Sequence, residues 1–324
     1  MQHHFHFHLH HHARHHARYD VDMTQGSTTR HLINFALPLL AGNLFQQLYN
    51  MVDTWVVGNF VSNEAFSAVG TVTPIINTLI GFFLGMSSGA GVVISQYYGA
   101  HRPEKVHEAV HTAMLLTIVM GVVFTGVGIA MTPLMLELMK TPKDVLPLSS
   151  LYLRIYFLGI PGTIMYNFGA ALLRAFGDTK RPMVFLTVSG VVNACLNLFF
   201  VIVCHMSVDG VATATVISQY ISLFLVVRCL CRSEGLSHLE LKEIRLDKEE
   251  SIRMIQIGFP AGLQSMLFSI SNVLVQSSVN SFGASVVAAN TAAASIEGFV
   301  YTAMNSVFHA AITFTSQNLG AGKL

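Results

Sequence analysis

The sequence predicts an all-α integral membrane protein, with a complete six-helix bundle followed by the first two helices of a second, parallel copy. Three observations lead to this fold class. The 324-residue chain is 52% hydrophobic and only 11% charged, too apolar to hide its surface in one soluble domain. Eight apolar segments are each long enough to cross a bilayer. Residues 36–100 also reappear loosely at 258–321, as in transporters built from two homologous bundles.

The eight apolar segments each hold roughly 20 residues or more, the length that a spanning helix needs. They lie at approximately 33–57, 69–98, 109–133, 148–173, 183–204, 210–229, 254–282 and 288–317. Short loops with turn-forming residues separate most of them. The exception is the strongly charged stretch before the seventh segment, which we expect to be partly helical. We therefore expect a first bundle at 23–231, a cytoplasmic linker at 232–253 and a partial second bundle at 254–324.

The repeat is anchored at both ends. Ala36-Leu37-Pro38 corresponds to Gly258-Phe259-Pro260, and Gln96-Tyr97-Tyr98-Gly99-Ala100 corresponds to Gln317-Asn318-Leu319-Gly320-Ala321. Four identities fall between these anchors: Asn50 with Asn272, Phe60 with Phe282, Thr71 with Thr291 and Ala90 with Ala311. If six helices are the repeat unit, about 12 complete it. The chain is thus expected to end inside its second bundle, with eight helices.

Positive charges predict the orientation of these segments. The loops after the second, fourth and sixth segments hold eleven Lys and Arg residues, whereas the loops after the odd-numbered segments hold only Lys140 and Lys143. Cytoplasmic loops are enriched in Lys and Arg. We therefore place the even-numbered loops and the N-terminus in the cytoplasm, with both bundles starting from that side and hence parallel.

Histidines cluster in two places. Nine of the 16 histidines fall within residues 1–16. This stretch is either a metal-binding tail or, as we favour, a disordered or non-native extension at 1–22 with Met23 as the true start. His101, His107 and His111 lie around a predicted cytoplasmic loop with no matching carboxylate. We therefore expect no metal site and no cofactor.

Several function classes are excluded by what the sequence lacks. No Gly-x-x-x-x-Gly-Lys-Ser/Thr pattern occurs, which argues against an ATP-driven pump. No nucleophile–base set stands out, so the protein is not expected to be an enzyme. The net charge of +1 is spread over loops and does not favour nucleic acid as a partner. Active transport would therefore draw its energy from an ion gradient.

Asp53 is the most informative single residue. It lies inside the first apolar segment, near its end, where an unpaired carboxylate costs several kcal/mol and usually faces a cavity that carries protons or cations. A position at the outer headgroups is the plainer alternative. Pro38 frees a backbone carbonyl in the same predicted helix. It is either an ordinary kink or a bend whose angle depends on the charge of Asp53.

Further polar residues lie inside the predicted helices. Asn193 and Asn197 are four apart, hence on one face of the fifth, and Thr215 lies in the sixth. On their own they favour helix–helix hydrogen bonding; next to an acid they would form a cation site or a proton relay. Glu297 is the only other acid well inside a segment. It is either a second charged site or a structural partner. Further candidates for a substrate cavity are Gln46, Tyr49, Asn50 and Gln276.

Three stretches of the chain resemble the MATE (multidrug and toxic compound extrusion) family. They are residues 35–53, which include Gln46-Gln47-Leu48-Tyr49-Asn50-Met51-Val52-Asp53, residues 89–100 and residues 173–182. The resemblance runs from about Met23 to Leu324 and is strongest for DinF-like prokaryotic members. It implies a 12-helix antiporter with two six-helix lobes around a V-shaped cavity, which exports organic cations in exchange for H⁺ or Na⁺.

The resemblance also implies roles for individual residues. Asp53 matches the acid of the family's first helix, Pro38 the proline at which that helix bends, and Asn193 and Thr215 their partners in the cation site. Asn197 departs from the pattern, because DinF-like members often have Asp there and an amide cannot titrate. Phe268 stands where another branch has Glu, which argues against the sodium-coupled branch.

We therefore expect a monomeric, cation-coupled (H⁺ or Na⁺) antiporter in the inner (cytoplasmic) membrane. Its partners would be the lipid bilayer and the drugs or other amphipathic compounds that it exports. Two alternatives stay open at this point. One is a truncated fragment that does not transport. The other is a lipid-precursor flippase of the same superfamily, which would need more helices and a cationic cavity.

Overall fold

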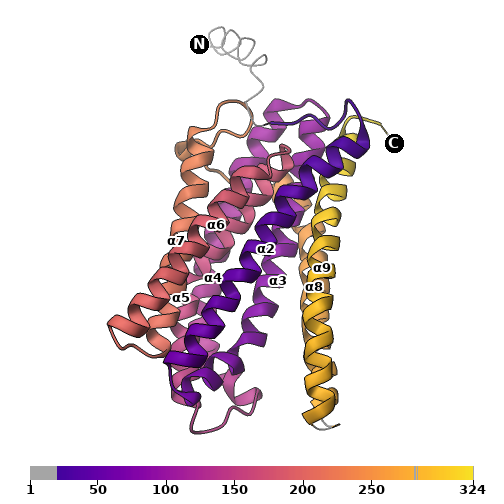
Figure 1. Cartoon of the computed structure of the whole chain (residues 1–324). Helices are drawn as coiled ribbons and strands as arrows, with labels where there is room; N and C mark the ends of the chain where they lie inside the picture. Colours follow the sequence, from indigo (N-terminus) through magenta and orange to yellow (C-terminus); the bar gives the residue numbers. More distant parts are fainter. Residues whose placement is uncertain (1–19, 281, 283, 324) are drawn as a thin grey trace.

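Eight long helices dominate the computed structural model, which describes residues 20–280, 282 and 284–323. They are α2 (Thr28–Phe60), α3 (Asn63–Gly99), α4 (Pro103–Leu138), α5 (Leu146–Ala175), α6 (Lys180–Leu198), α7 (Val208–Arg232), α8 (Lys248–Asn280) and α9 (Ala284–Gly320), shown in Figure 1. Two short elements complete the described chain: η1 (Phe199–Val203), a π-helical turn, and η2 (Leu241–Glu243), a 3₁₀ turn. Each long helix covers most or all of one predicted apolar segment, although α6 ends at Leu198 and α8 at Asn280, before the predicted ends at 204 and 282. The described chain thus contains eight long helices at the expected places.

Six of these helices are long and apolar enough, within the described residues, to cross a membrane by length and composition. They are α3, α4, α5, α6 with η1, α7 and α8. Helices α2 and α9 are as long but do not reach this apolarity over the residues described. Composition therefore supports a multi-pass membrane protein, with six candidate spans among the described residues where the sequence analysis expected eight.

Local chemistry sets the helix boundaries. The Ser62 hydroxyl accepts the Ala65 N–H at 3.2 Å and caps α3. Pro103 is the first residue of α4, where its missing N–H costs no hydrogen bond. Gly177, with φ of +82°, follows α5 in the left-handed region that suits glycine. Five prolines lie inside helices, as membrane helices tolerate: Pro38, Pro74, Pro133, Pro161 and Pro260.

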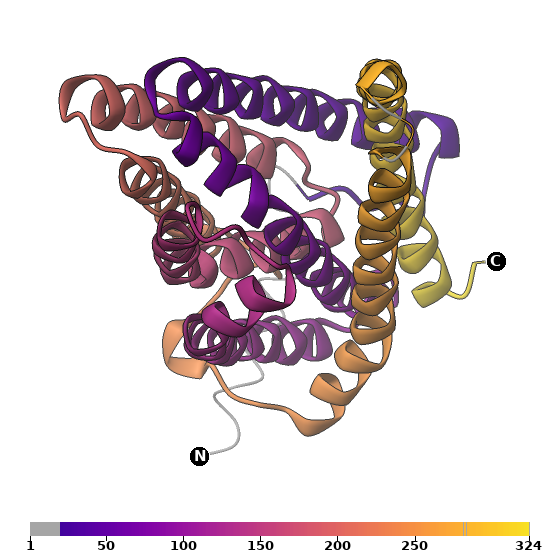
Figure 2. The same ribbon diagram turned by 90° about the horizontal axis from the view of Figure 1, so that it is seen from below.

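Helices α2 to α7 form a first bundle, and α8 and α9 stand together along one side of it (Figure 2). The first bundle has a core of fully buried side chains that includes Phe83, Phe157 and Phe168. Helix α8 packs along α3, and α9 packs along both α2 and α3. The pair therefore meets the first bundle on the face formed by its first two helices.

The two copies of the repeat touch each other at equivalent residues. A methyl group on Gly99 would lie 1.9 Å from the Gln317 carbonyl oxygen, and one on Gly320 would lie 1.9 Å from the Gln96 carbonyl oxygen. Gln96 and Gly99 are the repeat counterparts of Gln317 and Gly320. The contact is thus reciprocal, as expected for two parallel copies related by an approximate two-fold axis.

The linker between α7 and α8 contains little helix. Helix α8 begins at Lys248, before the predicted start at 254, and between the two helices only η2 is helical in the described chain. Leu239 is buried in the first-bundle core, whereas Leu246 is exposed. The apolar residues of this stretch therefore contact the first bundle through only part of its length.

Candidate functional site

A buried cluster of amides and hydroxyls lies between α6 and α7. Asn197 Nδ2 donates to Asn193 Oδ1 at 2.7 Å, and Asn193 Nδ2 donates to Ser218 Oγ at 3.2 Å. Asn193 is 5% exposed and Asn197 is fully buried. The Ser218 hydroxyl donates to the Thr215 carbonyl at 2.7 Å. Buried amides rarely occur without such partners, and here they form one connected chain across two helices.

Thr215 and the end of α6 complete this cluster. The Thr215 hydroxyl donates to the Val211 carbonyl at 3.0 Å within its own helix, which leaves its oxygen lone pairs as acceptors. Directly after Asn197 and Leu198, α6 widens into the π-helical turn η1, closed by the Cys204 N–H to the Phe199 carbonyl at 3.1 Å. Such π-turns are frequent at functional sites. The cluster thus lies at the point where α6 stops being a regular helix.

The predicted residues of α2 lie on the helix that packs against α6. Asp53, Tyr49 and Asn50 fall in α2, but their side chains are outside the part of the structure that is described. Pro38 is half-buried, and α2 continues as a helix through it. Gln46 is half-buried as well. The structure therefore brings the helix of Asp53 next to the helix of Asn193 and Asn197.

A polar groove opens between α3 of the first bundle and α8. It measures about 380 Å³ and is lined by residues from both helices: Gly70, Thr73, Pro74, Asn77, Ser269, Asn272, Val273 and Gln276. Gln276, predicted as a cavity residue, lines this groove, and Asn290 of α9 donates to its Oε1 at 3.2 Å. Glu297 is exposed on α9 and is not part of this lining. Thr73, Asn77 and Ser269 were not singled out from the sequence.

Glycines close the same two helices against each other at the other end. A methyl group on Gly85 would lie 2.3 Å from the Gly262 nitrogen, and one on Gly89 would lie 2.4 Å from the Met254 carbonyl oxygen. Gly258 approaches the Met86 carbonyl in the same way, at 2.7 Å. Small residues four apart on each helix permit this close backbone contact. Figure 1 shows that α3 and α8 converge toward the end that holds both described termini, and the groove lies at the opposite end.

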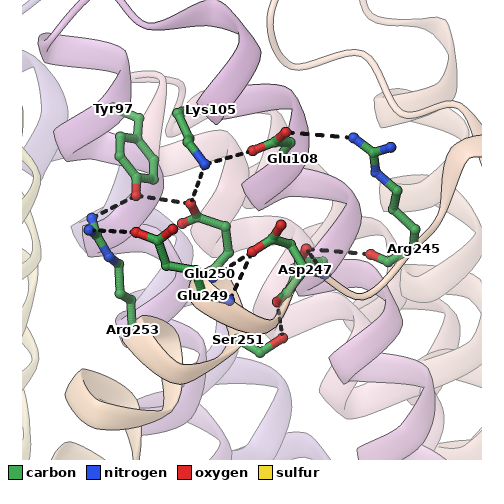
Figure 3. A network of polar contacts seen from close by, with 10 residues as sticks. Tyr97, Lys105, Glu108, Arg245, Asp247, Glu249, Glu250, Ser251 and Arg253 are labelled. Atoms are coloured by element: carbon green, nitrogen blue, oxygen red, sulfur yellow. Dashed lines mark hydrogen bonds and ion pairs between the residues drawn. The ribbon is translucent and has the colours of Figure 1, made fainter.

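A network of charged residues lies beyond the glycine contact (Figure 3). Glu250 is fully buried at the start of α8, where Tyr97 Oη of α3 donates to it at 3.0 Å and Lys105 Nζ of α4 lies at 3.4 Å. Arg253 donates to Tyr97 Oη at 2.7 Å and to Glu249 at 2.9 Å. This network joins the first turns of α8 to the ends of α3 and α4.

Asp247 anchors the start of α8 next to that network. Its Oδ1 accepts the N–H groups of Glu249 at 2.9 Å and Glu250 at 3.0 Å, an N-terminal cap. The Glu250 N–H, followed by that of Glu249, lowers the pKa of the Asp247 carboxyl below its ordinary value. The cap therefore stays ionised, and keeps its full strength, at neutral pH.

Comparison with known proteins gives a consistent set of relatives. A family profile described as MatE matches residues 38–199 and 260–324. The chain is 30% identical over 306 residues to "Probable multidrug resistance protein YpnP" of Bacillus subtilis, covering 93% of the chain and 67% of that protein. It is 31% identical to "Probable multidrug resistance protein YoeA" of the same organism, covering 92% of the chain and 66% of the relative. The chain thus spans about two thirds of the length of these relatives.

A solved structure shows the same fold. It is titled "Outward-facing conformation of a multidrug resistance MATE family transporter of the MOP superfamily". The two chains superpose with a TM-score of 0.84 at 23% identity, over 94% of this chain and 68% of the other. The arrangement of α2 to α9 therefore matches the fold of that part of the solved structure.

Proposed function

The chain belongs to the MatE family of membrane transporters, and we propose that it exports amphipathic organic compounds in exchange for H⁺ or Na⁺. The observation that carries this proposal is the contact between its two homologous parts. Helices α3 and α8 are sealed by glycines at one end and separated by a polar groove at the other. A carrier that alternates access needs such a contact, one that can close on one side and open on the other.

The groove supports an uncharged recognition surface that offers both polar and apolar groups. In the part of its wall that is described, Thr73, Asn77, Ser269, Asn272 and Gln276 supply hydroxyls and amides, with Pro74 and Val273 as apolar contacts. Such a lining suits amphipathic molecules, which need both apolar contact and a few hydrogen bonds. Two relatives are named as probable multidrug resistance proteins. Drug-like organic compounds are therefore the substrate class that we propose.

The amide and hydroxyl cluster supports a site for the coupling ion. Asn193, Asn197 and Thr215 bring carbonyl and hydroxyl oxygens together next to α2, and oxygen ligands are what Na⁺ or a hydrated proton requires. Asp53 is the proposed carboxylate of this site. Binding of the ion would neutralise Asp53 and change how α2 packs on α6, with Pro38 as the bend. Since Asn197 cannot titrate, Asp53 would carry the proton alone.

The distribution of charge supports the direction of export. The glycine contact, the charged network and the linker lie at the end where the even-numbered loops carry most of the Lys and Arg residues. That end faces the cytoplasm if the positive-inside rule holds. The groove then faces outward. We propose a location in the cytoplasmic membrane, with residues before α2 on the cytoplasmic side.

Ethidium efflux from cells tests this function. Cells that express the chain are loaded with ethidium, and the loss of fluorescence is followed for the parent, Asp53→Asn and Asp144→Asn. Asp144 is exposed in the α4–α5 loop and serves as the matched control. We expect efflux by the parent and by Asp144→Asn, and none by Asp53→Asn at equal membrane levels. Normal efflux by Asp53→Asn would overturn the coupling role.

A further inference from the structure

The linker brings a carboxylate to two histidines that lie far from it in the sequence. His107 and His111 are one turn apart near the start of α4, and their ring centres are 4.0 Å apart. Glu243, in η2 of the linker, places Oε2 2.7 Å from His107 Nε2. One ligand atom from each of the three residues lies within 4.8 Å of the others. The sequence analysis expected no metal site here because it found no carboxylate nearby; the fold supplies one.

We propose that His107, His111 and Glu243 bind a divalent transition-metal ion of the zinc type on the cytoplasmic side. Two imidazoles and one carboxylate are a ligand set that Zn²⁺ takes with a fourth position left for water. Imidazole nitrogens favour zinc-type ions, whereas Mg²⁺ and Ca²⁺ favour oxygen ligands. The site does not depend on the proposed export function.

His111 is already oriented for this role. It is almost fully buried, and its Nδ1 lies 2.7 Å from the His107 carbonyl oxygen, to which it donates. Metal-bound histidines usually donate their second ring N–H to such an acceptor, which holds the other nitrogen ready for the metal. His111 Nε2 faces the linker, where it accepts the Glu240 N–H at 3.1 Å. A metal ion would take this lone pair in place of the Glu240 N–H. Because Glu240 is exposed, water can then accept a hydrogen bond from that N–H.

The linker holds Glu243 in place from both sides. On one side Glu240 is bonded to His111, and on the other the Thr112 hydroxyl lies 3.4 Å from the Arg245 carbonyl and accepts the Asp247 N–H at 3.1 Å. The Thr112 contacts remain when a metal ion displaces the Glu240 N–H from His111, so the linker is already held beside α4 before binding, which reduces the ordering that binding requires. His107 and Glu243 are 40% and 52% exposed at their side chains, so an ion can reach them.

Charges of both signs lie around the cluster. Lys105 Nζ lies 2.9 Å from Glu108, and Arg245 Nη2 lies 3.6 Å from the same carboxylate. Both cations are therefore already paired with Glu108. Glu240 adds a further carboxylate close to the cluster, 3.9 Å from His238. A bound ion would fasten the linker to α4, and through Asp247 to the start of α8.

Hydrogen–deuterium exchange read by mass spectrometry tests this site in the full chain. All samples carry Gln in place of the nine histidines of residues 1–16, so that these do not compete for metal. We expect micromolar Zn²⁺ to slow exchange in the peptides that cover 236–247, and Mg²⁺ to have no effect. Local exchange reports the linker itself, so the result does not depend on transport.

Variants locate the ligands. Glu243→Gln keeps an acceptor for His107 but is a poor ligand, and we expect it to raise the Zn²⁺ midpoint at least tenfold, as loss of even an outer partner costs about that much. His111→Ala should abolish the protection. His238→Ala changes a linker histidine outside the cluster and should leave the midpoint unchanged. Unchanged exchange with Zn²⁺ in the parent, or equal protection in Glu243→Gln, would overturn the proposal.

Discussion

The glycine contact between α3 and α8 can be tested directly as the feature that keeps these two helices together at the end opposite the groove. In Gly85→Ala the new methyl carbon would lie 2.3 Å from the Gly262 nitrogen and 2.5 Å from the Ala261 carbonyl carbon. Optimal contacts lie near 3.5 Å, so the two backbones must separate by about 1 Å. Both obstructing atoms belong to the backbone and cannot rotate away. Overpacking of this kind costs about 1–3 kcal/mol.

That cost destabilises only the conformation in which these two helices touch. If the opposite state separates them, the equilibrium shifts away from the observed conformation by about 5- to 150-fold. The shift can be measured by electron–electron double resonance between spin labels on Phe66→Cys and Val275→Cys, both exposed on the groove side of α3 and α8. The four native cysteines are replaced in every sample.

We expect Gly85→Ala to shift the distribution of label–label distances, so that its main peak lies at a distance different from that of the parent. Gly126→Ala is the matched control, because a methyl group on this helical glycine of α4 meets nothing within 4 Å. It should leave the distance distribution of the parent unchanged. Identical distributions for Gly85→Ala and Gly126→Ala would refute the view that the glycine contact sets the closed end.

Three further predictions concern other parts of the chain. Glu250→Gln should lower the thermal unfolding midpoint, because weakening this buried acceptor costs about 1–3 kcal/mol of stability. The same change at its exposed neighbour, Glu249→Gln, should cost below about 0.5 kcal/mol. Burial raises the pKa of Asp20 to about 7, so the folded state binds the extra proton and stability should fall as pH rises from about 4 to 7; melting curves of Asp20→Asn should lack this fall. In efflux assays Asn193→Ala should lose activity, because Asn197 and Ser218 lose their shared partner, and Thr213→Ala, whose hydroxyl bonds within its own helix, should not.

The helices could be predicted because their signals are local. Each apolar segment shows its length directly, and the repeat relates distant segments by simple alignment. The reciprocal contact of Gly99 with Gln317 and of Gly320 with Gln96 lies at the anchors of that repeat. The alignment identified these residues as equivalent, but only the fold shows that they touch.

The sites were harder to predict because they depend on which helix faces meet. Asn193 and Asn197 were recognisable from their spacing, and the structure joins them by a hydrogen bond. Single polar residues such as Thr73 and Ser269 carry no such signal, since a lone hydroxyl can bond to its own helix. Glu297 was recognisable as an acid inside an apolar segment; it is exposed on α9, outside the groove lining, and its role in a cavity stays a prediction.

The carboxylate at the histidine pair could not be predicted for a related reason. Glu243 lies far from His107 in the sequence, and the linker follows no periodic pattern that would place it. Its position depends on two hydrogen bonds of the linker backbone: the Arg245 carbonyl accepts from the Thr112 hydroxyl, and the Glu240 N–H donates to His111. Backbone contacts of this kind leave no trace in residue type.

Gradient-driven transport by the purified chain tests the central claim most directly. Ethidium uptake into or release from proteoliposomes is followed after an H⁺ or Na⁺ gradient is imposed, for the parent and for Asp53→Asn. We predict that transport by the parent follows one of the two gradients and stops when that gradient is collapsed, and that Asp53→Asn shows only passive leakage. Transport that continues without either gradient, or that persists in Asp53→Asn, would contradict ion coupling through the first bundle.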